Sequence, residues 1–254
     1  MLVLDEAGML GTLDLDEILQ HAVERHTKVV LVGDPHHLPE IDAGGCFRAL
    51  AAQPDIVTLT ENRRQRHPHD RHKVELLRAG AGGDALAVAC EHGDVVLANN
   101  ADALLGCVVG DFCAAHTTDG SAVIIAARRS EVAELNARAR LEIDRAGQLG
   151  AERLELDGGE FAVGDIVVIK RNDKRLGIQN GNRGRVVAVA TDQRALRVKL
   201  ADGHMTDLDA RFLADTGRRQ QPALVHGYAA TAHVMQGQTA DRVFVLGSEG
   251  ISRE

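Results

Sequence analysis

The chain has 254 residues, of which 44% are hydrophobic and 26% charged, and its formal net charge at pH 7 is −8. This composition is ordinary for a globular protein and excludes one that is basic over its whole surface, so any contact with nucleic acid must come from local basic patches. Aromatic residues make up 2%, with one Tyr and no Trp, which argues against a stand-alone module that binds single strands by stacking bases on aromatic rings.

The first part of the chain predicts a strand, a helix and a second strand. Residues 2–4 and 29–32 are short apolar runs rich in branched side chains, which suit strands that are buried on both faces. Between them, the apolar residues from 15 to 23 recur with the period of a helix. Because such a crossover is right-handed, we expect the two strands to be parallel neighbours.

Acidic residues follow both of these strands. Asp5 and Glu6 come after the first strand, and Gly33 and Asp34 come after the second. Because the carboxyl ends of parallel strands meet at one edge of a sheet, we expect these residues to share one site. Asp5 can hold Mg²⁺ directly or through water, and Glu6 can orient and deprotonate an attacking water molecule. Taken alone, however, an Asp-Glu pair more often only ends a strand in solvent.

The middle of the chain predicts further helices and strands. Residues 47–52 favour a helix and residues 56–59 a strand, and residues 67–100 favour connecting helices interrupted by glycines. A buried strand is predicted at 122–126. Ser130 can cap the helix that follows, whose apolar residues keep helical spacing.

Residues 155–215 have a different character. Short strands separated by the turns Asn180-Gly181 and Asp202-Gly203 predict a small antiparallel barrel. This part of the chain is also its most basic stretch, with Lys170, Arg171, Lys174, Arg175, Arg183 and Arg185. A basic stretch of this kind usually forms a solvated charged face.

After the barrel the pattern returns to α/β, with a polar segment at 226–239 and a strand at 243–246. The segment offers small hydroxyl, amide and backbone donors, which suit phosphates better than base edges. Taken without the other motifs, Gly237 more simply turns the chain and His233 is a buried imidazole.

Four of these segments together resemble the motifs of the RecD-like branch of superfamily 1 DNA helicases, in particular the helicase portion of TraA-type conjugative relaxases. Residues 4–9 are similar to motif II, 31–39 to motif III, 59–65 to motif IV and 226–239 to motif V. Each segment alone is a weak signal, but four in the family order are a specific one.

The resemblance implies ATP and Mg²⁺ as cofactors of the complete protein, with Mg²⁺ on Asp5, and single-stranded DNA as a partner that is bound independently of its sequence. The implied catalytic residues are Asp5, Glu6, His37 and Arg64. The implied nucleotide-binding residues are Asp5, Glu6, Gly33, Asp34, Arg64, Gln236 and Gly237. The implied DNA-binding residues are Thr231, His233, Gln236, Thr239, Lys170, Arg171 and Arg183.

The resemblance also implies the fold. We expect an α/β protein with a partial first RecA-like domain at residues 1–55, which carries motifs II and III. A second RecA-like domain with motifs IV and V would take residues 56–154 and 216–254. The insert at 155–215 would be an SH3-like β-barrel. These boundaries are set by the family motifs and by the change in strand pattern.

Two motif residues differ from the family pattern. His37 stands where motif III usually has Gln, and an imidazole cannot both donate and accept at one end as a carboxamide does. Val234 stands where motif V commonly has Lys or Arg, which removes one phosphate contact. We therefore expect weaker coupling to ATP and somewhat weaker DNA binding.

The chain contains no Gly-x-x-x-x-Gly-Lys-Ser/Thr loop, and motif VI is not present. We therefore expect a fragment of an ATP-dependent DNA helicase or translocase of conjugation or repair, which does not hydrolyse ATP alone and whose partners include the missing segments of the parent helicase. The alternative is a non-enzymatic DNA-binding or interaction remnant.

The remaining patterns point to no other site. The four cysteines lack the Cys-x-x-Cys spacing of zinc sites, and the histidines at 36–37 and 67–69 have no partner cluster at helical spacing, so the sequence does not favour a bound transition metal. No apolar run is long enough to span a membrane. We expect a cytoplasmic protein.

Overall fold

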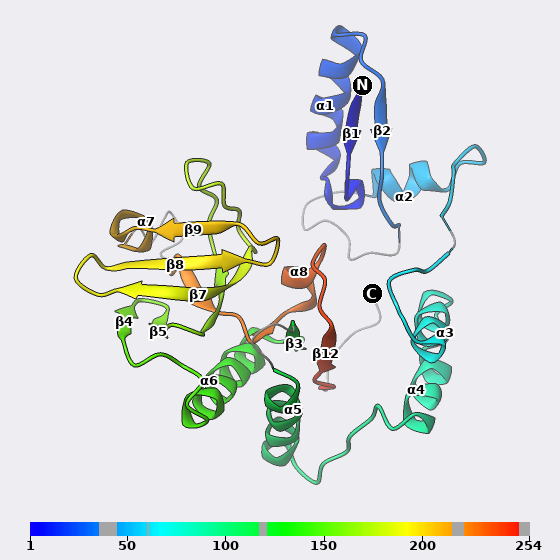
Figure 1. Ribbon diagram of the computed structural model, residues 1–254. Helices are drawn as coiled ribbons and strands as arrows, with labels where there is room; N and C mark the ends of the chain where they lie inside the picture. The colour runs from blue at the N-terminus through cyan, green and yellow to red at the C-terminus, as the bar shows by residue number, and fades with distance from the viewer. Residues whose placement is uncertain (36–44, 60, 117–120, 215–220, 249–254) are drawn as a thin grey trace. The chain divides into compact units, whose positions relative to one another are not determined.

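The computed structural model describes residues 1–35, 45–59, 61–116, 121–214 and 221–248. The chain forms two compact units that divide between Val96 and Leu97 (Figure 1). We call residues 1–96 unit 1 and residues 97–253 unit 2. The assignment of residues 56–154 and 216–254 to one RecA-like domain stays a prediction.

Unit 1 begins with the predicted strand, helix and strand. β1 (Leu2–Leu4) and β2 (Val29–Leu31) are parallel neighbours, paired along all their residues. A 3-10 helix, η1 (Ala7–Met9), and α1 (Thr12–Glu24) connect them. The parallel arrangement that the sequence predicted is therefore confirmed.

The expected burial of these strands on both faces is wrong for the described structure. Leu2 is 38% exposed and Val3 is 52% exposed, and every residue of β2 is only half-buried. The physical reason is that strands are buried on both faces only where helices cover both faces of the sheet, and the described part of unit 1 packs little against the two faces of β1 and β2.

Three more helices follow in unit 1: α2 (Cys46–Ala51), α3 (Pro68–Arg78) and α4 (Gly82–Glu91). α3 and α4 pack against each other as a hairpin. Gly80 lies in the turn between them with φ +75°, a conformation that glycine adopts without a Cβ penalty. The predicted strand at 56–59 is wrong, because these residues form no strand and the side chains of Val57 and Leu59 are each 89% exposed.

Unit 2 contains a three-stranded parallel sheet in the order β11-β3-β12, that is Ala229–Ala230, Ala122–Ile125 and Arg242–Val245. α5 (Ala101–Ala115) packs on β3 and β12, and α6 (Arg129–Arg145) packs on β11 and on α5. The buried strand predicted at 122–126 is thereby confirmed.

The helix after β3 begins earlier than the sequence predicted. Arg128, not Ser130, is the residue before its first turn, and the Arg128 N–H donates to Oε2 of Glu131 at 3.0 Å. This acceptor three residues into the helix satisfies a backbone donor that would otherwise lack an intrahelical partner.

The other part of unit 2 is a five-stranded antiparallel sheet in the order β10-β6-β7-β8-β9. Its strands are β6 (Ile166–Ile169), β7 (Arg183–Ala190), β8 (Ala195–Leu200), β9 (Met205–Leu208) and β10 (Leu224–His226). A separate ribbon pairs β4 (Arg153–Leu156) with β5 (Gly159–Ala162), and the short helix α7 (Ala210–Ala214) follows β9.

The antiparallel strands expected at 155–215 are thus present, but the described strands form an open sheet and a ribbon, and no closed barrel is found among them. β8 shows why the sheet forms. Leu196, Val198 and Leu200 alternate with polar residues, and they are buried in the core between this sheet and its neighbours. Within the described ranges, no helix has both the length and the apolar character needed to cross a membrane.

Candidate functional site

The acids after β1 lie at the carboxyl edge of the sheet of unit 1. The Val32 N–H donates to the Leu4 carbonyl at 2.8 Å, and the Ala7 N–H donates to the Val32 carbonyl at 2.8 Å. Between these bonds, Glu6 takes the left-handed conformation with φ +50°, and its N–H donates to Oδ1 of Asp5 at 2.9 Å. The turn with both carboxylates is thereby fixed beside the end of β2.

Two glycines allow the turn after β1 to approach the end of β2. A Cβ on Gly33 would lie 2.9 Å from Cζ of Phe47 and 3.2 Å from the backbone nitrogen of Gly8. A Cβ on Gly8 would lie 3.5 Å from the carbonyl oxygen of Asp34. Motifs II and III therefore meet in unit 1, under a ring from α2 that sequence reasoning did not single out.

Asp34 has a charged partner from another element. Nη2 of Arg78, in the last turn of α3, donates to Oδ2 of Asp34 at 2.6 Å. The Asp34 side chain is 19% exposed and that of Arg78 is 50% exposed. Sequence reasoning missed Arg78, because no local pattern connects residues so far apart.

The other two implied catalytic residues are less defined. Arg64 is exposed in an irregular segment between α2 and α3, where its N–H donates to Oδ1 of Asn62 at 3.1 Å. Its neighbour Arg63 pairs with Glu61 at 2.6 Å. His37 lies outside the described residues. Unit 1 thus brings together Asp5, Glu6, Gly33 and Asp34 of the predicted set.

In unit 2, the motif V segment forms α8 (Ala232–Met235) directly after β11. Thr231 is the residue before the helix, at the carboxyl end of a parallel strand. Gly237 follows with φ +74°. Of the predicted residues here, Thr231, His233 and Gln236 are half-buried, and Gly237 and Thr239 are exposed.

Gln238, which sequence reasoning did not select, connects this segment to the antiparallel sheet. Its Nε2 donates to the carbonyl of Gly181 at 2.9 Å and to that of Val234 at 3.0 Å. Gly181 belongs to the Asn180-Gly181 turn that the sequence predicted. No sequence signal could have found Gln238, because its contact with the turn becomes visible only in the folded structure.

Arg183, one of the predicted DNA contacts, has partners inside unit 2. Its Nε donates to the carbonyl of Gly227 at 2.8 Å and its Nη2 to that of Ala122 at 2.6 Å. Burial, together with the nearby charge of Arg185, lowers the pKa of Arg183 to about 10. The guanidinium joins β7 to the parallel sheet, and its contact with DNA stays a prediction.

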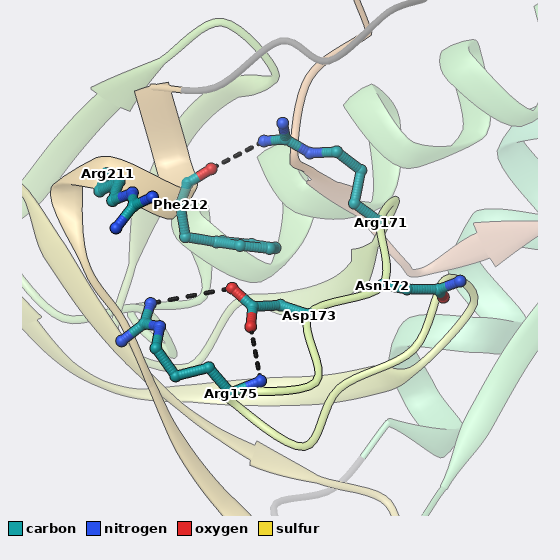
Figure 2. A pocket seen from close by; sticks show the side chains of 6 residues that line it. All are labelled: Arg171, Asn172, Asp173, Arg175, Arg211 and Phe212. Carbon is teal, nitrogen blue, oxygen red and sulfur yellow. Dashed lines mark hydrogen bonds and ion pairs between the residues drawn. The ribbon is translucent and has the colours of Figure 1, made fainter.

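Arg171 lies at a pocket of about 330 Å³ (Figure 2). Its Nη2 donates to the carbonyl of Phe212 at 2.7 Å, and its guanidinium lies 5.2 Å from the centroid of the Phe212 ring, within the range of a cation–π contact. The pocket is lined by Arg171, Asn172, Asp173, Arg175, Arg211 and Phe212.

Lys170, the neighbouring predicted contact, is half-buried after β6. Burial lowers the pKa of its ammonium, and the charge of Arg129 in the first turn of α6 lowers it further. The positive charges of Lys170 and Arg129 therefore repel each other.

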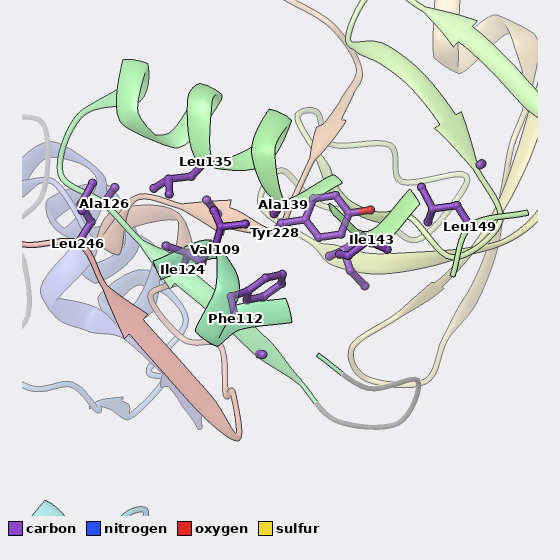
Figure 3. Close-up of a cluster of buried hydrophobic side chains, with 14 residues drawn as sticks. Val109, Phe112, Ile124, Ala126, Leu135, Ala139, Ile143, Leu149, Tyr228 and Leu246 are labelled. Atoms are coloured by element: carbon purple, nitrogen blue, oxygen red, sulfur yellow. The ribbon is translucent and has the colours of Figure 1, made fainter. Parts of the chain in front are cut away.

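A buried polar network anchors the start of the motif V segment. The Tyr228 hydroxyl donates to Oδ1 of Asp165 at 2.5 Å, and Nε of Arg140 donates to the same oxygen at 3.1 Å. Asp165 also accepts the Ala162 N–H at 2.7 Å. Burial and the Asp165 charge raise the pKa of Tyr228. Figure 3 shows the Tyr228 ring within the hydrophobic cluster of the parallel sheet.

Comparisons with known proteins agree with the motifs. A family model described as an AAA domain matches residues 1–100. The conjugal transfer protein TraA of Rhizobium radiobacter is 32% identical over 258 residues, which are 99% of this chain and 22% of that protein. The RecBCD enzyme subunit RecD of Mycolicibacterium smegmatis is 27% identical over 273 residues, which are 97% of this chain and 44% of that protein.

Among solved structures, the Pif1 helicase from Bacteroides in complex with ADP-AlF3 and ssDNA matches with a TM-score of 0.58 and 19% identity, over 98% of this chain and 65% of that one. The chain spans 22% of the length of the TraA relatives that it matches. Together these findings confirm the resemblance that motifs II to V indicated.

Proposed function

We propose that this chain, which resembles the RecD-like branch of superfamily 1 helicases in its motifs, its relatives and its fold, forms part of an ATP-dependent translocase on single-stranded DNA. The observation that best supports this is the meeting of two acidic turns at one sheet edge, where Gly8 and Gly33 pack against each other in unit 1. Acidic groups at the carboxyl edge of a parallel sheet suit Mg²⁺ and nucleotide phosphates.

The acids would divide the work of ATP hydrolysis. Asp5 is exposed, and a carboxylate is a ligand type that Mg²⁺ prefers, so Asp5 would hold the ion directly or through water. Mg²⁺, when bound, neutralises charge on the phosphates. Glu6 would orient the attacking water and accept its proton, while Arg64 would contact the γ-phosphate and His37 would sense it.

The motif V segment and the antiparallel sheet would bind DNA. Thr231 at the carboxyl end of β11, and His233, Gln236 and Thr239 in and after α8, offer hydroxyl, imidazole and amide groups. Such groups bond to the sugar–phosphate backbone and carry no sequence information. Lys170, Arg171 and Arg183 would add charge to this path, as proposed from the sequence.

The finer domain assignment belongs to the same proposal. Residues 1–55 would be part of a first RecA-like domain, and residues 56–154 with 216–254 a second one. The antiparallel strands within 155–215 would correspond to an SH3-like insert, although the sheet that they form also includes β10. Because the 254 residues contain no phosphate-binding loop, the chain alone would not hydrolyse ATP, and its cofactors and further partners would act only with the rest of a helicase.

A chimera tests the catalytic part of the proposal. The equivalent region of the Rhizobium radiobacter TraA protein is replaced by residues 1–254 of this chain, and DNA-stimulated ATP hydrolysis is measured. We expect turnover that Glu6→Gln abolishes while nucleotide binding persists. The control is Glu17→Gln, an exposed acid on α1, which should leave the rate unchanged. Equal rates in the Glu6→Gln chimera and its parent would reject the role of Glu6.

DNA binding is tested on the chain itself. Fluorescence anisotropy of labelled single strands of unrelated sequence should give similar affinities that fall with salt, and Lys170→Ala should reduce the salt slope by about 1. Lys199→Ala, an exposed lysine on β8, serves as the control. The proposed DNA-binding role would be contradicted by an affinity that depends strongly on base sequence. It would also be contradicted if Lys199→Ala, but not Lys170→Ala, changes the dependence of the affinity on salt.

A further inference from the structure

Residues from the two ends of the α3–α4 hairpin come together in a cluster that the helicase motifs do not use. His69 and Asp70 lie in the first turn of α3, and Asp94 follows the end of α4. One imidazole nitrogen and one oxygen of each carboxylate all lie within 4.8 Å of one another. We call these three residues the hairpin cluster.

Imidazole rings border the hairpin cluster on both sides. The ring of His69 stacks on that of His92, with centroids 4.5 Å apart, and on that of His67 at 5.5 Å. Nδ1 of His92 lies 2.9 Å from the carbonyl of Val88. That contact favours the tautomer in which Nδ1 carries the proton and Nε2 has a lone pair. Two further imidazoles, those of His67 and His92, therefore adjoin the one that belongs to the cluster.

A cation already lies between the two carboxylates. Nζ of Lys73 is 2.8 Å from Oδ1 of Asp70 and 2.5 Å from Oδ2 of Asp94, and its side chain is 19% exposed. The position between the two carboxylates thus stabilises positive charge, and His69, whose Nε2 lies 3.6 Å from Oδ1 of Asp70, adds an imidazole nitrogen beside it.

We propose that His69, Asp70 and Asp94 bind a divalent transition metal ion such as Zn²⁺, which takes the place of the Lys73 ammonium. One nitrogen and two oxygens are a ligand set for Zn²⁺, and three protein ligands leave a fourth position for water. The imidazole favours such an ion over Mg²⁺ or Ca²⁺, which prefer oxygen ligands alone.

Metal binding would connect the start of α3 to Asp94, which follows the end of α4. Both ends of the hairpin would then be held by one ion instead of one flexible side chain. The ligands are separated by a whole helix pair along the sequence, which is why the spacing of the histidines alone did not indicate the site. This inference is independent of the proposed function.

The test uses the whole chain with Co²⁺ alone as a spectroscopic probe and Zn²⁺ alone as a competitor. We expect one ion per chain with visible absorption, displacement by Zn²⁺, and a higher midpoint of thermal unfolding with metal. His69→Asn and Asp94→Asn should each lower the affinity by more than roughly tenfold. The matched control is His72→Asn, because His72 lies on the same helix and pairs with Glu75 outside the cluster.

A further variant tests the exchange with the ammonium. Lys73→Met keeps most of the apolar stem and removes the charge, so it should bind Co²⁺ more tightly than the parent chain. Circular dichroism confirms that each variant is folded. The proposed site would be overturned if Co²⁺ does not bind, if His72→Asn weakens binding as much as the ligand variants, or if His69→Asn leaves the affinity unchanged. An unchanged Co²⁺ affinity in Lys73→Met would overturn the exchange with the ammonium.

Discussion

His116 lies in the core of unit 2 against two aromatic rings. Its ring centroid is 5.3 Å from that of Phe112 and 6.2 Å from that of Tyr228. Burial, with smaller contributions from Arg185 and Arg183, lowers the pKa of His116 to about 4 from an ordinary value of 6.5. The folded chain therefore resists protonation of this imidazole, whereas the unfolded chain does not.

This difference predicts a loss of stability in mild acid. Above pH 6.5 neither state is protonated at His116, and between pH 6.5 and 4 only the unfolded state takes up the proton, so the free energy of unfolding falls. The expected loss over this range is about 2–3 kcal/mol. Urea unfolding between pH 7 and 4 measures it, and His116→Gln should flatten the curve. Parallel curves for both proteins would contradict the prediction.

Asp165 is fully buried, so its removal should be costly. Asp165→Ala leaves the Arg140 guanidinium and the Tyr228 hydroxyl without their shared acceptor, and the expected destabilisation is about 3–5 kcal/mol in urea unfolding. The control is Asp207→Ala, which breaks an exposed pair with Arg197 and should change little. Similar effects of both substitutions would show that burial does not set the cost.

For single residues, the sequence predicted which residues follow a strand better than it predicted which partners their side chains contact. The position of Asp5 and Glu6 after a strand followed from local pattern, because strand ends are local. The partners of Arg183 and Asp34 did not, since their contacts with the parallel sheet and with Arg78 join elements far apart in the chain. The local sequence around an arginine does not distinguish a guanidinium that faces solvent from one that donates to a buried carbonyl.

Among the elements, the close approach of α2 and the 3-10 helix η1 to the chain after β2 depends on the missing side chain of Gly33. A Cβ on Gly33 would lie 2.9 Å from the Phe47 ring, closer than real contacts allow. A Cβ at Gly33 therefore requires the Phe47 ring to move and, because it would also lie 3.2 Å from the backbone nitrogen of Gly8, presses on the turn after β1. Overpacking of this kind typically costs about 1–3 kcal/mol.

We therefore expect Gly33→Ala to destabilise unit 1, and Phe47→Leu to restore part of the loss in the double variant. Hydrogen exchange of the β1 and β2 amides reports the effect locally. Gly83→Ala is the control, because a Cβ there meets nothing within 4 Å and alanine favours a helix. Unchanged exchange in Gly33→Ala would show that the ring moves aside freely.

The elements themselves were largely predictable where periodicity was strong. Strand, helix and parallel strand at the start, and the strand at 122–126, followed from apolar runs and helical spacing. The run at 56–59 has strand composition but no strand, because composition does not supply a neighbour to pair with. The expected barrel failed at closure for a similar reason, since turn residues define hairpins but not which end strands meet.

For the whole molecule, the two units differ in how much apolar surface they bury. Unit 2 has two large clusters of buried hydrophobic side chains. The buried hydrophobic residues in the described part of unit 1 are small or few: Ala7, Leu15, Ala22 and Ala85. Because burial of apolar surface is the main stabilising contribution, the units should differ in stability.

Limited proteolysis and hydrogen exchange test this difference in the intact chain. We expect the segment at residues 1–55 to be cut and exchanged faster than the strands of unit 2, whose amides should be protected up to the global unfolding free energy. Equal protection of β1 and β3 would contradict the expectation and would imply that unit 1 gains burial that its own described residues do not provide.

The amide of Gln238 has a mechanical implication. One nitrogen bonds to carbonyls of two segments, Gly181 in a turn of the antiparallel sheet and Val234 in α8. N–H···O hydrogen bonds usually span about 2.7–3.2 Å between donor and acceptor, so both bonds are kept only when the turn and the helix stay close to their present separation. A displacement of the turn relative to α8 therefore lengthens or breaks at least one of the two bonds, so the Gln238 amide couples the positions of these two segments of unit 2 at a cost of about 1 kcal/mol per bond lost.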